Sequence, residues 1–165
     1  MDHLPINHRL RPFWRVLAFL TGVYVLGFGV FGYLQTKDSG LGTFARDDLP
    51  TVLGLQTNPA FAMLSIAVGA VTVLAVIVGR NVDFIVDFVA GSIFLLAGMA
   101  MLGLLHTDLN YLGFTVATCN VSFVVGLVLL TAGLYGRVGP EEAAEAEEER
   151  RHRVVGSNQG VVGDA

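Results

Sequence analysis

The sequence predicts an all-α protein, a bundle of four transmembrane helices with both termini on the same side of the membrane. Hydrophobic residues make up 53% of the 165 residues and charged residues only 15%, whereas about a quarter of a soluble domain is charged. Four long stretches contain no Asp, Glu, Lys or Arg: Val16–Leu34, Phe61–Gly79, Phe88–Leu105 and Leu112–Gly136. Crossing a hydrocarbon core of about 30 Å takes roughly 20 helical residues. A helix also pairs its backbone groups internally, as lipid requires.

The first apolar stretch resembles a signal peptide at its start, because three arginines precede it: Arg9, Arg11 and Arg15. The apolar run is too long for the hydrophobic region of such a peptide, and no small-x-small cleavage site follows before Lys37. We therefore expect a retained first helix. Residues 1–15 are predicted to form a cytoplasmic flank at the level of the lipid headgroups.

Positive charge predicts the orientation. Two basic residues, Lys37 and Arg46, fall on one side of the predicted helices, and the other eight fall on the opposite side: Arg9, Arg11, Arg15, Arg80, Arg137, Arg150, Arg151 and Arg153. The positive-inside rule places that second side, with both termini, in the cytoplasm. We expect a multi-pass protein of the cell (inner) membrane, with a transmembrane domain at 16–136 and a charged, partly disordered cytoplasmic tail at 137–165.

The long exterior connection spans residues 35–60. Within it we expect a short helix that starts at Asp47–Pro50 and carries three apolar residues, Val52, Leu53 and Leu55. Thr57 or Asn58 then suits the N-cap of the second spanning helix, with Pro59 in its first turn. The other two connections are short, which makes the second helix antiparallel to the third, and the third to the fourth.

The second and fourth stretches form an internal repeat. The segments 65–79 and 122–136 match at a constant offset of 57 residues, and both read Ser-x-x-x-Gly followed by a second Gly ten residues later. Both predicted helices run in the same direction, so this is a parallel pseudo-repeat. Small residues one turn apart allow helices to approach closely in lipid. The predicted packing residues are Ser65, Gly69, Ser122, Gly126, Ala132 and Gly136.

Three polar residues in or near the membrane segments form a possible polar or ion site: Asp83, Asp87 and Asn120. Asp83 and Asp87 are four residues apart and share a helix face, and ionisable groups are costly in lipid. The pair handles a proton or cation, or else Asp83 caps the third helix and Asp87 pairs with Arg80 or with a loop near the interface. We expect Asn120 to point inward, either into a polar pocket or into hydrogen bonds between helices.

No catalytic or cofactor motif is present. Gly27, Gly29 and Gly32 spell G-x-G-x-x-G, but they fall inside a predicted spanning helix, where that pattern does not bind a dinucleotide. His106 with Asp108 provides too few ligands for zinc, which usually takes three or four. We therefore predict no metal, no cofactor and no enzyme activity. No basic and aromatic surface for nucleic acid is evident either.

The segment Leu53–Pro59 reads L-G-L-Q-T-N-P, and Gly69 follows ten residues after Pro59. This resembles the pattern L-G-L-x-x-N-P-x-H-N-x-x-H-x-x-x-G of a domain-of-unknown-function family. Its members are small four-helix integral membrane proteins common in high-GC Gram-positive bacteria. The resemblance covers about residues 22–136, and it implies the same four-helix fold.

The chain departs from that family at its polar positions. Phe61 and Ala62 stand where the family has His-Asn, and Ser65 stands at the next His. In the last helix, Cys119 and Ser122 occupy the Asn and His positions. If the family uses these histidines for metal, proton or quinone chemistry, this member has lost them.

The sequence favours a non-catalytic accessory or assembly subunit of a larger membrane complex, for example a respiratory one. Its expected partners are the lipid bilayer and other membrane proteins. The alternative is a small transporter, channel or ligand-binding membrane protein that uses the regions of Asp87 and Asn120.

Overall fold

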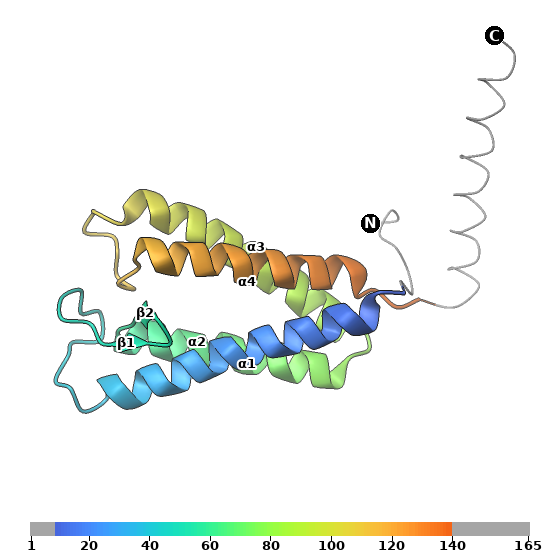
Figure 1. The fold of residues 1–165 in the computed structure, drawn as a ribbon, viewed down its shortest axis with the longest axis horizontal. Helices are drawn as coiled ribbons and strands as arrows, with labels where there is room; N and C mark the ends of the chain where they lie inside the picture. Colours follow the sequence, from blue (N-terminus) through green and yellow to red (C-terminus); the bar gives the residue numbers. More distant parts are fainter. Residues whose placement is uncertain (1–8, 140–165) are drawn as a thin grey trace, which may run out of the picture.

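The computed structural model describes residues 9–139, which fold into four helices and one two-stranded hairpin. The helices are α1 (Arg11–Thr36), α2 (Pro59–Val78), α3 (Val82–Leu104) and α4 (Val116–Tyr135). Figure 1 shows a rod in which α1 lies beside α2, and α3 beside α4. All four helices are long and apolar enough to cross a membrane. The prediction of an all-α four-helix bundle is confirmed, and the chain has the build of a multi-pass membrane protein.

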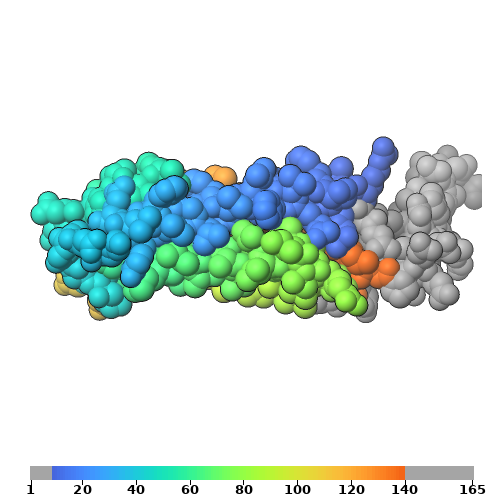
Figure 2. All heavy atoms as spheres, turned by 90° about the horizontal axis from the view of Figure 1, so that it is seen from below, coloured from blue at the N-terminus to red at the C-terminus, as the bar shows by residue number. Residues whose placement is uncertain are grey.

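The two ends of the rod differ in chemistry. We call the end where α1 begins and α4 finishes the arginine end, because Arg11, Arg15 and Arg80 belong to it. The opposite end carries the strands β1 (Thr51–Val52) and β2 (Leu55–Gln56), and we call it the hairpin end. Figure 2 shows the α1 and α2 face of the rod, with these helices side by side along its length.

The start of α1 differs from the prediction. This helix begins at Arg11, inside the flank predicted at 1–15, and Pro12 lies in its first turn. Proline suits that position because its missing N–H has no helical partner there in any case. Residues 1–8 of the flank lie outside the described residues. So does the predicted charged and disordered tail from residue 140 onward.

The buried residues of the helices recur at alternating spacings of four and three. In α1 they include Ala18, Gly22, Val25, Gly29, Gly32 and Thr36, and in α4 they include Thr118, Ser122, Val125, Leu129 and Ala132. This heptad-like spacing is typical of nearly antiparallel or parallel helices with a slight left-handed twist. All six predicted packing residues are buried in the structure: Ser65, Gly69, Ser122, Gly126, Ala132 and Gly136.

The repeat seen in the sequence is also a repeat of structure. Helices α2 and α4 have 20 residues each, and their bounds are offset by the same 57 residues as the sequence repeat. The N-caps Asn58 and Thr115 are both extended, and each side chain accepts a hydrogen bond from a backbone N–H in the first turn. Each repeat-related helix packs mainly on the helix before it in the chain, α2 on α1 and α4 on α3.

The short helix expected after Asp47–Pro50 is wrong. The chain there forms an antiparallel β-hairpin, in which Val52 pairs with Leu55. The two residues between them, Leu53 and Gly54, have φ angles of 48° and 85°. Positive φ at both central residues is the geometry of a tight hairpin turn and is incompatible with a helix. Val52 and Leu55 are buried in an apolar cluster that fills the hairpin end.

Asn58 joins the two helix pairs at the hairpin end. Its Oδ1 accepts a hydrogen bond of 2.8 Å from the Phe61 backbone N–H, which confirms the predicted N-cap of α2. Its Nδ2 donates to the backbone oxygens of Ala45 and Tyr111, both at 3.0 Å. Tyr111 belongs to the connection between α3 and α4. One fully buried amide therefore ties the long loop, α2 and the second helix pair together.

The close approach of α1 and α2 at Gly69 provides a test of the packing. A Cβ at this position would lie 2.7 Å from the Leu26 Cα atom, so the backbone would have to shift. We expect Gly69→Ala to lower the free energy of unfolding by about 1–3 kcal/mol, measured as a lower Tm in detergent. The matched control is Gly27→Ala, because nothing lies within 4 Å of a Cβ there. Equal losses in both variants would contradict close packing at Gly69.

Candidate functional site

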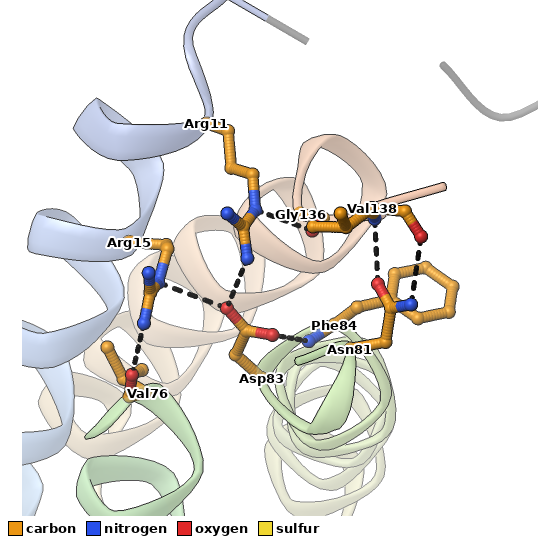
Figure 3. Close-up of polar contacts among 8 residues, drawn as sticks. All are labelled: Arg11, Arg15, Val76, Asn81, Asp83, Phe84, Gly136 and Val138. Atoms are coloured by element: carbon orange, nitrogen blue, oxygen red, sulfur yellow. Dashed lines mark hydrogen bonds and ion pairs between the residues drawn. The ribbon is translucent and has the colours of Figure 1, made fainter. Parts of the chain in front are cut away.

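A charged cluster closes the arginine end of the bundle. Asp83, in the first turn of α3, is only 1% exposed. Its Oδ2 atom lies 3.1 Å from Nε of Arg15 and 3.4 Å from Nη2 of Arg11, both on α1 (Figure 3). Its Oδ1 accepts a hydrogen bond of 3.0 Å from the Phe84 backbone N–H. The carboxylate is thus paired with two guanidinium groups and with the start of its own helix, where negative charge is favourable.

The same two arginines also reach the ends of the remaining helices. Arg11 Nε donates a hydrogen bond of 3.0 Å to the backbone oxygen of Gly136, which follows α4. Arg15 Nη2 donates to the backbone oxygen of Val76, in the last turn of α2. Backbone carbonyls at the C-terminal end of a helix lack the helical partners of the interior, and the arginines donate to them here. Every helix of the bundle therefore contributes to one cluster around Asp83 (Figure 3).

Two further contacts bind α4 to this end. Asn81 exchanges a pair of hydrogen bonds with the backbone of Val138, with Nδ2 donating at 2.9 Å and Oδ1 accepting at 2.7 Å. The Trp14 ring stacks on the Tyr135 ring, with centroids 6.0 Å apart and an interplanar angle of 14°. These contacts leave the arginine end closed across all four helices.

The structure separates the roles of the two predicted aspartates. Asp83 does lie in the first turn of α3, but its charge partners are the α1 arginines, 72 and 68 residues away. Asp87 is 2% exposed, and its Oδ1 has no hydrogen-bond partner within residues 9–139. The expected pairing of Asp87 with Arg80 is wrong, because Arg80 is exposed and no ion pair joins them. Arg11 and Arg15 are four residues apart, as Asp83 and Asp87 are. This matching spacing was the sequence signal that could have indicated a cluster of charges from α1 and α3.

The expectation that Asn120 points inward is also wrong, since its side chain is exposed. The buried face of α4 passes through Thr118, Cys119 and Ser122, which places Asn120 on the other side of the helix. Asn120 lies in the second turn of α4, near the hairpin end, where headgroups and interfacial water can solvate an amide. Asp87 is near the opposite end, so the two residues do not form one site.

A lateral groove opens between α2 and α3, with a volume of about 470 Å³. We call it the α2–α3 groove, and its walls include Ala67, Val68 and Val71 from α2 and Val89, Ile93 and Ala97 from α3. The two helices are joined by a tight turn at the arginine end and diverge from there (Figure 1). They diverge because α2 packs closely on α1, and α3 on α4. The groove is therefore a consequence of the pairwise packing, and no pattern in the sequence predicted it.

A smaller cavity of about 30 Å³ is lined by residues of all four helices and by the buried Leu55 of the hairpin. We call it the hydroxyl pocket, because four of the residues that line it carry a hydroxyl group: Tyr24, Ser65, Thr118 and Ser122. It shares Phe61, Ser65, Phe94 and Ser122 with the groove, so the two spaces adjoin. Ser65 and Ser122 are the two equivalent serines of the repeat. Predicted as packing residues, they also lie where the groove and the hydroxyl pocket adjoin.

The histidine at the hairpin end has no metal-site geometry. His106 is exposed, and Asp108 pairs with Arg46, whose Nη1 lies 3.1 Å from its carboxylate. Among residues 9–139, no group of three or more His, Cys, Asp or Glu side chains is arranged to hold a metal ion. Neither cavity includes Asp87 or Asn120 in its lining.

The charged cluster gives a test that distinguishes the two aspartates. We expect Asp83→Asn to lower the free energy of unfolding by roughly 1–3 kcal/mol, because it leaves two half-buried guanidinium groups without their counterion. Asp87→Asn should leave Tm unchanged or raise it, because it removes a charge whose Oδ1 has no partner. Asp108→Asn is the exposed control, with an expected loss of about 0–1 kcal/mol. Thermal unfolding in detergent measures all three, and equal losses at Asp83 and Asp108 would contradict the buried cluster.

No family model, curated protein or solved structure matches this chain. The resemblance to the four-helix family of high-GC Gram-positive bacteria therefore stays a prediction.

Proposed function

We propose that this chain is a non-catalytic membrane protein that binds a lipid-soluble molecule in the α2–α3 groove. The supporting observation is the groove itself, a space of about 470 Å³ between two membrane-spanning helices. Sites for small molecules usually have roughly 300–1,000 Å³, mostly apolar walls and a few polar groups. This proposal keeps the class of ligand-binding membrane protein but places the site away from Asp87 and Asn120.

The walls of the groove suit an apolar molecule that arrives sideways from the bilayer. Val71, Val89 and Ile93 are about half exposed, at 53%, 49% and 59%. No Asp, Glu, Lys or Arg lines the groove. Along α3 the lining runs from Ile85 to Ala97, which is about 18 Å at a rise of 1.5 Å per residue. A leaflet contributes about 15 Å of hydrocarbon, so a single apolar chain fits along the groove.

Filling the groove should remove this binding. We expect Ala67→Phe to reduce the labelling of α2 and α3 by a photoreactive hexadecane several-fold, because the ring occupies the groove. The measurement is mass spectrometry of labelled peptides from the full chain in lipid nanodiscs. Val124→Phe is the control, since Val124 is 62% exposed on α4 and does not line the groove. Equal labelling of the parent and the Ala67→Phe variant would overturn the proposed site.

A second candidate function is the accessory or assembly subunit of a larger membrane complex. The observation that favours it is the poor coverage of α3, in which only Asp83, Asp87, Gly91 and Gly98 are buried among 23 residues. Each of the other helices buries seven or eight residues. The exposed side of α3, with Leu96 at 66% and Met99 at 65%, offers a surface on which a partner's transmembrane helix can pack.

A photo-crosslinking residue at Leu96 tests this candidate in native membranes. We expect an adduct with another protein at Leu96 and none at Val23, an exposed position on α1. Adducts with lipid alone at both positions would contradict the proposed accessory function.

We also propose that the protein lies in the cell membrane with the arginine end in the cytoplasm. The support is the charge count within the described residues. Lys37 and Arg46 lie toward the hairpin end, whereas five arginines lie at or near the arginine end: Arg9, Arg11, Arg15, Arg80 and Arg137. An excess of this kind marks the cytoplasmic side.

A further inference from the structure

We propose that Ser65 and Ser122 recognise the head of the bound molecule, and that this molecule is an uncharged lipid with one long apolar tail and a terminal hydroxyl or carbonyl oxygen. The inference rests on the proposed function of the α2–α3 groove and names the class of ligand. The tail would lie in the groove, and the oxygen would reach the hydroxyl pocket between the two serines.

Burial and hydrogen bonding at the two serines support this site. Each is 5% exposed, and each lines both the groove and the hydroxyl pocket. The Ser65 Oγ donates a hydrogen bond of 2.8 Å to the Phe61 backbone oxygen, so its lone pairs remain available to accept. Within the described part of the chain, Ser122 makes no side-chain hydrogen bond, and its oxygen is not among the fully buried polar atoms that lack a partner. Since Ser122 lines both cavities, its hydroxyl is accessible there and a ligand oxygen could pair with it.

The size of the pocket limits the head of the ligand. A cavity needs roughly 10–15 Å³ to hold one water molecule, and the hydroxyl pocket has about 30 Å³. It therefore admits a hydroxyl or a carbonyl oxygen but no phosphate headgroup, sugar or ring. The aromatic side chains of Phe61 and Phe94 line both spaces.

The charge around the pocket indicates that the head is uncharged. No Asp, Glu, Lys or Arg lines either cavity. The buried carboxylate of Asp83 is already paired with Arg11 and Arg15 at the arginine end. A carboxylate or ammonium head would lose its hydration in the pocket without gaining a counterion, which disfavours it strongly in a membrane.

The test compares three photoreactive probes with the same chain and the same diazirine: hexadecan-1-ol, hexadecane and hexadecanoate. Each is offered to the full chain in nanodiscs, and labelled peptides of α2 and α3 are quantified against total probe in the disc. We expect the alcohol to label about threefold to tenfold more than the alkane, as one or two added hydrogen bonds allow. Ser122→Ala should reduce the preference for the alcohol over the alkane, because one of the two serine partners is lost, and leave alkane labelling unchanged.

Thr131→Ala is the matched control, because it removes a hydroxyl from the same helix at a residue that lines neither cavity. It should keep the alcohol preference. A Tm equal to that of the parent chain shows that a serine variant is folded. If Ser122→Ala does not fold, Ser65→Ala takes its place in the test. Equal labelling by alcohol and alkane in the parent chain would mean that the pocket does not recognise the oxygen, and it would overturn the inference. Preferred labelling by hexadecanoate would overturn the uncharged head.

The two proposals fail differently. If all three probes label the groove equally, the groove still binds apolar chains and only the recognition by the serines is lost. If no probe labels the groove above the lipid-facing surface of α4, the proposed function itself fails.

Discussion

Helices in lipid gain nothing from the hydrophobic effect by meeting one another, so this bundle depends on how closely their backbones can approach. The closest approaches lie within the pairs α1–α2 and α3–α4. A Cβ at Gly29 would lie 2.8 Å from the Ala62 backbone oxygen, and one at Gly133 would lie 2.8 Å from the Phe88 Cα atom. Tight packing within each pair leaves α2 and α3 free to diverge, and their divergence creates the groove. The proposed binding site thus follows from where the glycines are.

Polar side chains hold the two pairs together at the ends of the rod. Asp83 binds arginines from α1 at one end, and Asn58 spans the loops at the other. In a low-dielectric environment such groups are stable only when nearly all their partners are present. The two helix pairs are therefore tied together at both ends, and the groove opens between α2 and α3. The polar groups proposed to bind a ligand there are Ser65 and Ser122, the equivalent serines of the repeat.

Much of the fold was predictable because lipid imposes few choices. The absence of charge over about 20 residues is enough to predict each spanning helix, and the Asn58–Pro59 cap and the 57-residue repeat were both readable from local patterns. The hairpin at Thr51–Gln56 was not predicted, because its turn needs Leu53 in a left-handed conformation that only the surrounding packing selects. Asn120 was misplaced because polarity alone does not say on which side of a helix a residue lies, nor how near the interface.

The sequence by itself determined that residues 9–139 contain four helices long and apolar enough to cross a membrane, and which residues of α2 and α4 are equivalent. Those properties depend on composition and on short-range spacing. Only the tertiary structure decided that Arg11 and Arg15 pair with Asp83, and that Ser65 and Ser122 line a common pocket. These contacts join residues 57 to 72 positions apart, and their geometry depends on which helix packs on which. Local patterns carry no information about that choice.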